Sequence, residues 1–350
     1  MTADITIRPF RPQDFAAVQR IWNQCCEAGE TLYYPLTEDY FQKKFLLGDG
    51  CEKENLLTAE IEGQAAGFLH GVAPGTFALS RPGKAYLTCV FVDRSARGRG
   101  AGRALVSAFQ ERMKARGADA LCMSNLNPVN LDWRIPGTPG HDHNNMPGAD
   151  MEAPGYGFLE KMGFAAVYQE VAMYLDLSRY CPPPFLPAMR ARLADQGIYA
   201  GPYDPDWNCE FDGMCDRVGS DYWRDVLRTE IAAWKTGGPN ADPRMWADGV
   251  RPRGPRTLLT AVHENHIVGF TGPVDLQKSG RGWFTGICTD PLYERRGIAT
   301  VLFHALMEAF VREGAQFTTL FTGADNHAQK IYLGAGLRPV RRFALMSKGL

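Results

Sequence analysis

Two short stretches combine glycine and arginine with the start of a helical pattern. They are RGRGAG at residues 97–102 and RRGIA at residues 295–299. Glycines let the backbone approach a ligand closely, arginines add positive charge, and the first N–H groups of a helix lack intrahelical partners. Such a loop can bind a phosphate group, although a plain tight turn uses the same glycines.

The glycine spacing excludes two common nucleotide-binding motifs. No Gly-Lys-Ser or Gly-Lys-Thr follows either loop, so a phosphate loop of the Walker type is absent from the sequence. Gly98, Gly100 and Gly102 read GRGAG, which does not fit the GxGxxG fingerprint of dinucleotide-binding domains. The loops therefore need another interpretation.

The two loops belong to an internal repeat. Residues 89–118 align without a gap with residues 286–315, so that Gly100 matches Gly297 at an offset of 197 positions. After each loop, apolar residues recur every three or four positions, which predicts a helix, and a glycine follows as its C-terminal cap. Before each loop, apolar and β-branched residues predict a strand. Two copies in register favour a ligand-binding role over a plain turn.

The same periodicities predict strands in both halves and a helix over residues 222–235. Residues 198–220 give no clear prediction. The expected strands are 5–8, 55–60, 64–72 and 85–93 in the first half, and 257–262, 267–274 and 283–289 in the second.

A proline-rich segment separates the halves. Residues 178–187, SRYCPPPFLP, contain four prolines in ten positions, which is typical of an extended linker. With 350 residues in the chain, each half is long enough to bury its own core. We expect an N-terminal domain over residues 1–177 and a C-terminal domain over residues 188–350.

The loops and a later element resemble the GNAT superfamily of acyl-CoA-dependent N-acetyltransferases. Residues 97–102 fit its R/Q-x-x-G-x-G/A pyrophosphate motif, and residues 294–299 fit it except that Glu294 replaces Arg or Gln. The segment NHAQKIYLGAGL, residues 326–337, is similar to the later N-x-x-A-x-x-x-Y-x-x-x-G-F element of the family. The opening IRPFRPQD resembles the family's first strand and turn. The resemblance covers most of both halves.

This resemblance implies an α/β fold of the three-layer α+β type. Each half would be a GNAT-like domain with a mixed, mostly antiparallel, splayed sheet flanked by helices, and the tandem organisation resembles that of mycothiol synthase. Acetyl-CoA would be the acyl donor, with its pantetheine arm in the split of the sheet and its pyrophosphate at the glycine loop. The implied donor-binding residues are Val90, Val92, Arg97, Gly98, Arg99, Gly100, Ala101 and Gly102 in the first half, and Ile287, Thr289, Arg295, Arg296, Gly297, Ile298, Ala299, Thr300 and Asn326 in the second.

The resemblance also implies one catalytic residue. The family usually protonates the departing CoA thiolate with a tyrosine four residues before the closing glycine, and Tyr332 stands there in the second half. Leu159 holds the corresponding place in the first half. The first half thus has the better phosphate loop and the second has the tyrosine. We expect the second half to carry the chemistry, with a half-buried packing role as the alternative for Tyr332.

The first copy carries a long insertion at about residues 126–154, rich in Pro, Gly, Asn and Asp. A loop of this length is often functional, and its polar residues are suited to recognition of a polar amine or an aminosugar. A surface loop without a specific role is the alternative. The His-x-His spacing lacks the pattern of strong zinc sites, so we expect no metal. The candidate substrate-binding residues are Trp133, His141, Asp142, His143 and Asp150.

The composition limits location and partners. A net charge of -1 gives no sign of a nucleic-acid-binding surface, and no apolar run approaches the ~20 residues of a membrane span. The N-terminus has no secretion-signal pattern, and the nine cysteines are scattered without a CxxC pair. We therefore expect a cytoplasmic protein without nucleic-acid or membrane partners.

The glycine loops together with the family resemblance imply an acetyl-CoA-dependent N-acetyltransferase. A small polar amine would attack the thioester directly in a ternary complex. Two alternatives remain at this point: a non-catalytic protein that binds or senses CoA, and an aminoacyl or peptide transferase of related fold that uses no CoA. The glycine loops disfavour the CoA-free transferase, and Tyr332 disfavours the non-catalytic protein. The chain would act as a monomer with an internal pseudo-dimer, or as a homodimer.

Overall fold

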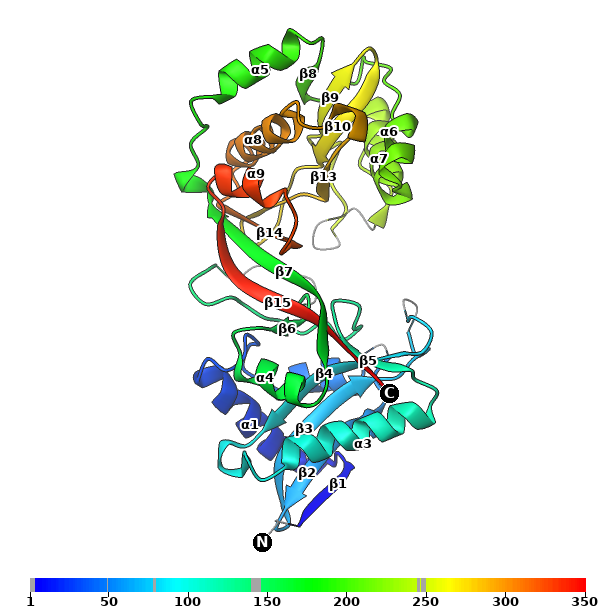
Figure 1. Ribbon diagram of the computed structural model, residues 1–350, viewed down its shortest axis with the longest axis vertical. Helices are drawn as coiled ribbons and strands as arrows, with labels where there is room; N and C mark the ends of the chain where they lie inside the picture. Colours follow the sequence, from blue (N-terminus) through cyan, green and yellow to red (C-terminus); the bar gives the residue numbers. More distant parts are fainter. Residues whose placement is uncertain (1–3, 49, 78–79, 140–145, 244–245, 247–249) are drawn as a thin grey trace. The chain divides into compact units, whose positions relative to one another are not determined.

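The computed structural model describes residues 4–350 apart from 49, 78–79, 140–145, 244–245 and 247–249. The chain forms two compact units (Figure 1). The first consists of Met1–Val171 together with Arg341–Leu350, and the second of Ala172–Val340. The last ten residues thus belong to the first unit, whereas the sequence placed all of 188–350 in the C-terminal domain. The cause is strand pairing, since the end of the chain bonds to a strand of the first unit.

The sheet of the first unit is mixed and mostly antiparallel. Its first four strands pair antiparallel in chain order, the fifth pairs parallel with the fourth, and the end of β15 pairs antiparallel with the fifth. A short strand, β6 (Ala149–Asp150), pairs with β15 beside them. The other strands are β1 (Ile5–Pro9), β2 (Leu56–Ile61), β3 (Gln64–Val72), β4 (Lys84–Val92), β5 (Ala120–Met123) and β15 (Arg338–Gly349).

Helices cover both faces of this sheet, which gives the three layers that the sequence predicts. Helix α3 (Ala101–Ala115) buries Leu105 and Phe109 against one face. Helix α1 (Phe15–Glu27) buries Trp22 against the other, where its ring lies 4.7 Å from that of Phe91. The remaining helices of this unit are α2 (Glu38–Phe41), continued by a π-turn at Gln42–Leu46, and α4 (Pro154–Lys161).

Strands β4 and β5 separate soon after they meet. Their parallel pairing runs only from Lys84 opposite Ala120 to Tyr86 opposite Cys122, although β4 continues to Val92. The sheet is therefore split beyond this point, as the family resemblance implies. The open edge of β4 leads directly to the glycine loop.

The second unit repeats this plan. Strands β8, β13, β10 and β9 form an antiparallel sheet, and β12 pairs parallel with β14. The pair Arg281 and Phe317 reproduces Lys84 and Ala120 at the same offset of 197. The strands are β8 (Tyr199–Pro202), β9 (Leu259–His263), β10 (His266–Gly272), β11 (Asp275–Leu276), β12 (Arg281–Trp283), β13 (Gly286–Thr289) and β14 (Phe317–Gly323), and β7 (Ala165–Asp176) ends beside β14.

Two expected features of the second unit differ in the structure. Residues 283–289 are not one strand, because the chain breaks between β12 and β13 at the split of the sheet. Residues 198–220, which the sequence left unassigned, contain β8 and α6. The helices are α5 (Leu186–Ala194), α6 (Asp212–Val218), α7 (Asp221–Thr236), α8 (Ile298–Arg312) and α9 (Gln329–Gly334).

The proline-rich segment packs onto α8 instead of spanning open solvent. The Tyr180 hydroxyl lies 3.0 Å from Nδ1 of His304, and the Phe185 ring contacts the same imidazole. Arg190 of α5 pairs with Glu308 at 2.7 Å. Helix α8 is therefore covered on its outer face as well as on its sheet face. None of the helices in the described part of the chain has both the length and the apolar character needed to span a lipid bilayer.

Candidate active site

The glycine loop of the first unit has the backbone that a phosphate cradle needs. Gly98 and Gly100 adopt φ of +75° and +102°, which other residues rarely adopt without strain. Gly100 is the N-cap of α3, so no capping side chain covers the first N–H groups of the helix. These groups and the positive end of the helix dipole remain available to an anion.

A groove of about 430 Å³ lies against this loop. Its floor is the open edge of β4 with Val90 and Val92, and its far wall is the start of α4. The groove is tight at Gly102, where an added Cβ would lie 3.2 Å from the Phe158 ring. The structure thus brings together most of the predicted donor-binding residues of the first half. Those that line the groove are Val90, Val92, Arg97, Gly98, Gly100, Ala101 and Gly102.

Two smaller cavities continue the groove along the split of the sheet. One of about 120 Å³ shares Glu30, Val90, Phe91 and Gly155 with the groove. It meets the next, of about 30 Å³, at a wall of shared residues that includes Thr88. The middle cavity therefore adjoins both the groove at the glycine loop and the innermost cavity. The residues common to the two inner cavities are Tyr33, Thr88, Met123, Met146 and Gly148.

Arg97, the first residue of the motif, is held over the groove by a carboxylate. Its guanidinium donates to Glu30 at 2.7 and 3.1 Å and to the Val92 carbonyl at 3.2 Å. Arg94 donates to the same carboxylate at 2.7 Å. Hydrogen bonds and charge from Arg97, then from Arg94, lower the pKa of Glu30 to about 2. Glu30 therefore stays ionised and neutralises part of the positive charge near the loop.

Three polar side chains from different elements meet beside the innermost cavity. The Thr88 hydroxyl accepts a hydrogen bond from Asn127 Nδ2 at 3.0 Å and lies 3.1 Å from His70 Nδ1. All three residues are buried, and burial lowers the pKa of His70 to about 3, so its imidazole is neutral at physiological pH. Sequence reasoning missed this cluster. Histidine inside an otherwise apolar strand was the available signal.

The candidate residues of the long insertion have separate surroundings. Trp133 is 2% exposed and packs edge-on against Phe343 of β15, with ring centroids 5.5 Å apart. Asp150 lines the 120 Å³ cavity, but both its oxygens accept hydrogen bonds from Arg341, at 2.8 and 2.7 Å. These contacts anchor the insertion to β15. The other three candidates, His141, Asp142 and His143, lie outside the described residues.

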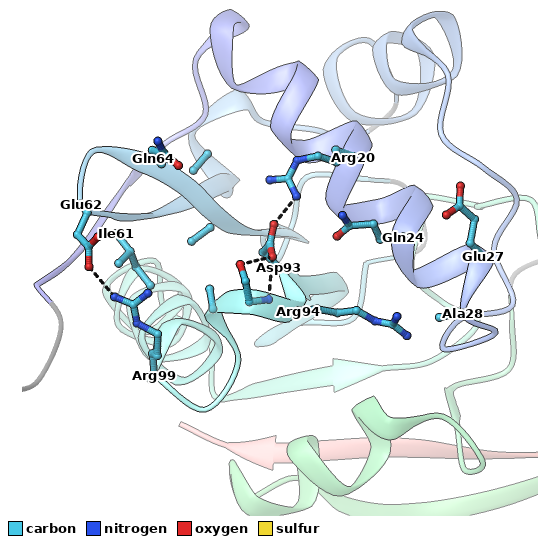
Figure 2. A pocket seen from close by; sticks show the side chains of 14 residues that line it. Arg20, Gln24, Glu27, Ala28, Ile61, Glu62, Gln64, Asp93, Arg94 and Arg99 are labelled. Carbon is cyan, nitrogen blue, oxygen red and sulfur yellow. Dashed lines mark hydrogen bonds and ion pairs between the residues drawn. The ribbon is translucent and has the colours of Figure 1, made fainter.

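A larger cavity of about 730 Å³ lies on the other side of the loop (Figure 2). Arg20 of α1 points toward Asp93 at the end of β4, and Arg99 pairs with Glu62 at 2.8 Å (Figure 2). Asp93 also accepts a hydrogen bond from the Ser95 N–H and so caps the turn before the loop. These pairings indicate that the polar lining supports the loop. Arg99, predicted to contact the donor, faces this side.

The supporting ion pair is repeated in the second unit. Arg217 of α6 donates to Asp290 at 2.9 Å, and Asp290 is fully buried. Both residues stand 197 positions after Arg20 and Asp93. Asp290 likewise accepts a hydrogen bond from a backbone N–H of the following turn, at 3.0 Å. The pair is therefore part of the shared scaffold.

The glycine loop of the second unit keeps its shape but is covered on one side. Arg295 and Gly297 adopt φ of +61° and +93°, close to the values of Gly98 and Gly100. An added Cβ at Gly297 would lie 3.0 Å from the sulfur of Met189 on α5. Helix α5 therefore lies directly against this loop.

The arginines and the helix start of this loop have contacts of their own. The Arg296 carbonyl accepts a hydrogen bond from Arg192 of α5 at 3.3 Å, and the Arg296 guanidinium lies 4.9 Å from the centre of the Tyr293 ring. Ile298 is 1% exposed, and Thr300 is half-buried in the first turn of α8. The Asn326 side chain accepts a hydrogen bond from the Ala328 N–H at 2.9 Å. All of these contacts are within the protein, and the donor-binding role of these residues stays a prediction.

Among the described residues, the split of the second unit does not repeat the polar cluster of the first. Thr285 corresponds to Thr88, but its buried hydroxyl has no hydrogen-bond partner among the described residues. Gly272, the partner of Gly286 across β10 and β13, stands where the first unit has His70. An added Cβ at Gly286 would lie 2.1 Å from the Trp223 ring. An indole ring of α7 therefore occupies the space beside this strand.

Tyr332 lies in a packed environment on α9. It is 7% exposed, and its ring lies 4.9 Å from that of Phe303 on α8. Burial raises the pKa of its hydroxyl. The catalytic role predicted for Tyr332 stays a prediction. The described residues contain no group of three or more His, Cys, Asp or Glu placed to hold a metal ion.

Comparisons with known proteins agree with this architecture. The sequence profile of the acetyltransferase (GNAT) family matches residues 15–131 and 222–335. A glucosamine N-acetyltransferase region of a fungal multi-domain enzyme is 15% identical with a TM-score of 0.56, covering 99% of this chain and 38% of that one. A GCN5-related N-acetyltransferase from Sphaerobacter thermophilus is 18% identical with a TM-score of 0.51, covering 99% and 95%. The chain thus spans well under half of the first of these proteins.

A tandem GNAT protein from the clavulanic acid biosynthesis pathway is 17% identical, with a TM-score of 0.48 and coverage of 99% and 98%. No curated protein sequence matches the chain. At these identities the first two solved structures indicate the fold alone. The two regions matched by the family profile together make up more than half of the chain, one in each repeat. The chain belongs to the acetyltransferase (GNAT) family and carries two copies of its domain in tandem.

Proposed function

We propose that the first unit binds acetyl-CoA and transfers its acetyl group to a small polar amine by direct attack in a ternary complex. The observation that carries the proposal is the set of three adjoining cavities, of which the first lies at the glycine loop and the last is lined by Thr88 and Asn127. This proposal places the reaction in the first copy, whereas the sequence favoured the second through Tyr332.

The residues of the groove fit the acyl donor. The loop and the start of α3 offer unpaired N–H groups to a pyrophosphate. Arg97, which pairs with Glu30 here, can pair with the pyrophosphate instead. The open edge of β4 offers backbone groups to the amides of the pantetheine arm. The half-buried Val90 and Val92 supply an apolar wall for the arm. The acetyl group would then reach the inner cavities near Thr88.

The reaction makes clear demands on the inner cavities. The amine must lose its proton before it can attack the thioester carbon, and negative charge develops on the carbonyl oxygen. The C–S bond then breaks, the amide forms, and the thiolate takes up a proton. Tyr33 and Thr88 are the hydroxyl residues that line both inner cavities, and Asp150 lines the larger of them. Because Asp150 is paired with Arg341, this wall is polar without a free negative charge, which suits a small polar acceptor.

A thiol-release assay tests the proposal. The full chain is incubated with acetyl-CoA and an amine panel of glucosamine, putrescine and glycine, and free CoA thiol is followed with a chromogenic disulfide. We expect at least one amine to raise thiol release at least tenfold, with the acetylated amine found by mass spectrometry. Gly100→Asp, which places a side chain and a negative charge in the loop, is expected to abolish the signal.

Two other outcomes point to other functions. If acetyl-CoA binds and no amine accelerates thiol release, the protein is better described as a non-catalytic CoA-binding or CoA-sensing protein. If the folded chain neither binds nor consumes acetyl-CoA, a transferase that uses no CoA becomes the leading interpretation. We further propose a cytoplasmic protein that works without nucleic-acid or membrane partners, as a monomer with an internal pseudo-dimer or as a homodimer.

A further inference from the structure

Thr88 stands at an irregular point of its strand. His70 pairs with Cys89 and Gly71 pairs with Leu87, which leaves Thr88 as the extra residue of a β-bulge. Bulges re-aim side chains and are common next to active sites. Here the bulged residue faces both inner cavities, at the place where β4 and β5 have just separated.

The partners of Thr88 are fixed by their own contacts. The Oδ1 atom of Asn127 accepts a hydrogen bond from the Val129 N–H at 2.9 Å, so its Nδ2 is the atom that faces Thr88. Asn127 therefore donates to the threonine hydroxyl. Since the asparagine is 7% exposed and held at its other end, this donor cannot turn away without breaking a second bond.

The tautomer of His70 follows from its burial. Its Nε2 atom is buried and has no hydrogen-bond partner among the described residues, and the ring meets Phe45 edge-on with centroids 5.1 Å apart. A buried N–H without an acceptor destabilises the folded state more than a buried nitrogen lone pair without a donor. The proton of the neutral ring therefore belongs on Nδ1, which donates to Thr88 at 3.1 Å.

The Thr88 oxygen thus receives two hydrogen bonds, and both its lone pairs are used. Its own O–H is left as a donor, and the residue lines the two inner cavities. A hydroxyl is normally free to donate or accept. In this setting it can only donate. Two incoming hydrogen bonds also polarise the O–H and strengthen the bond that it makes.

We propose that the Thr88 hydroxyl is a preorganised hydrogen-bond donor to the carbonyl oxygen of the bound thioester, with His70 and Asn127 as its positioning residues. This inference rests on the proposed function. When the amine nitrogen bonds to the carbonyl carbon and the C–S bond weakens, charge grows on that oxygen, and Thr88 stabilises it while keeping its own proton. The departing thiolate takes up the equivalent of the proton that the amine loses.

The second unit provides an internal comparison. Thr285 occupies the equivalent position, but Gly272 replaces the histidine and Ala324 stands where the first copy has Asn127. The Thr285 hydroxyl is buried and has no partner among the described residues. Nothing there fixes the hydroxyl as a donor. The arrangement of Thr88 is thus a property of the first copy and not of the shared scaffold.

Isotope-edited infrared spectroscopy with acetyl-CoA carrying ¹³C at the thioester carbonyl tests the inference. A hydrogen bond to the carbonyl oxygen lowers its stretching frequency. We expect the bound wild-type frequency to lie below that of free acetyl-CoA and to return toward the free value in Thr88→Val. Thr88→Ser, which keeps the hydroxyl, is expected to retain the lower frequency. Thiol release at saturating acetyl-CoA should fall roughly 100-fold in Thr88→Val and by less than about threefold in Thr88→Ser.

The outcomes separate the two levels of the argument. If acetyl-CoA binds with wild-type affinity and Thr88→Val leaves the carbonyl frequency unchanged, the inference is wrong and the proposed function stands. If the folded wild-type chain does not bind acetyl-CoA, the proposed function fails and the inference fails with it. Should Thr88→Val not fold, the wild-type spectrum still decides, because an unshifted carbonyl frequency contradicts any donor at this oxygen. If Thr88→Val does not fold, Thr88→Ala takes its place. A carbonyl frequency that is lowered equally in wild type and in Thr88→Ala would overturn the role of Thr88.

Discussion

The two copies share a scaffold and differ in what surrounds the split in their sheets. The register of the parallel strand pair recurs at the offset of 197 residues, and so does the pairing of an arginine with a buried aspartate. In the first copy, adjoining cavities lie between the loop and the Thr88 cluster. In the second, Trp223 lies against Gly286 and α5 lies against the loop. The elements that fold the domain are thus separable from those that build a site.

The second glycine loop keeps the backbone conformation of the first although its surroundings differ. Arg295 keeps the left-handed conformation that Gly98 adopts in the first copy, although that conformation costs a non-glycine residue of order 1 kcal/mol. The turn is therefore maintained by the surrounding contacts, including Asp290 at its base. A conserved-looking loop shape does not by itself indicate a working phosphate site.

The largest expected difference between the copies concerns donor binding. Gly100→Asp adds a negative charge beside the proposed pyrophosphate site and a side chain at a φ of +102°, so we expect acetyl-CoA affinity to fall by more than about 100-fold. The matched variant Gly297→Asp should leave affinity within about threefold. Equilibrium dialysis with labelled acetyl-CoA measures both, with circular dichroism as the folding control. A larger loss in Gly297→Asp would reverse our assignment of the two copies.

The buried histidine predicts a second difference, in stability against pH. The pKa of His70 is about 3 in the folded chain because of burial, below the ordinary ~6.5 of an unfolded chain. Between these two pKa values only the unfolded state binds the proton. The contribution of neutral His70 to the free energy of unfolding is therefore fully present above pH ~6.5 and is lost as pH falls. We expect His70→Gln to reduce the slope of unfolding free energy against pH by about 1.4 kcal/mol per pH unit between pH 6 and 4.

Urea unfolding of both proteins at several pH values measures this slope. The carboxylates and the other histidines are common to both proteins, so they cancel in the difference. Equal slopes for wild type and His70→Gln would show that His70 is not buried in neutral form. That result would also remove the basis for its assigned tautomer.

Glu30 provides a smaller test of the first copy, because its carboxylate lies between two arginines beside the first glycine loop. Its carboxylate neutralises Arg97 and adds negative charge near the proposed pyrophosphate site. We expect Glu30→Gln to bind acetyl-CoA roughly fivefold more tightly, an effect that fades at high salt. Titration at 50 mM and 500 mM salt checks it. Weaker binding in this variant would indicate that Glu30 itself positions the donor.

The smallest expected effect is that of Tyr332→Phe. If the first copy carries the reaction, loss of this hydroxyl changes thiol release by less than about twofold. Tyr332 lies in the second unit, where it packs against Phe303 of the same unit. The assay is the same thiol release with acetyl-CoA and amine. A fall of tenfold or more would support the sequence-based prediction and move the catalytic centre to the second copy.

The sequence predicts the scaffold well because its signals are local or repeat. The strand over residues 64–72 matches β3, the helix over 222–235 matches α7 within one residue at each end, and the glycines of the first loop mark the positive φ angles. The repeat itself predicts two copies of one domain. Each of these features depends on periodicity or on glycine chemistry within a few residues.

The site is less predictable because its residues meet across elements. Thr88, His70 and Asn127 come from a strand, its neighbour and the long insertion, and no spacing in the sequence connects them. The end of β15 joins the first unit and supplies Arg341 to Asp150, which chain order does not suggest. The position of Trp223 beside Gly286 is likewise a matter of packing. Alignment of the two copies therefore reveals the shared scaffold. It does not reveal that Trp223 lies beside the split in the sheet of the second copy.

The stoichiometry of acetyl-CoA binding to the wild-type chain tests the central claim most directly. Isothermal titration of the full chain at low salt gives the number of sites and their affinity in one experiment. We expect one site per chain. Two sites of similar affinity would show that both loops bind the donor and would contradict the contrast drawn here between the copies. No binding by the folded protein would contradict the proposed function itself.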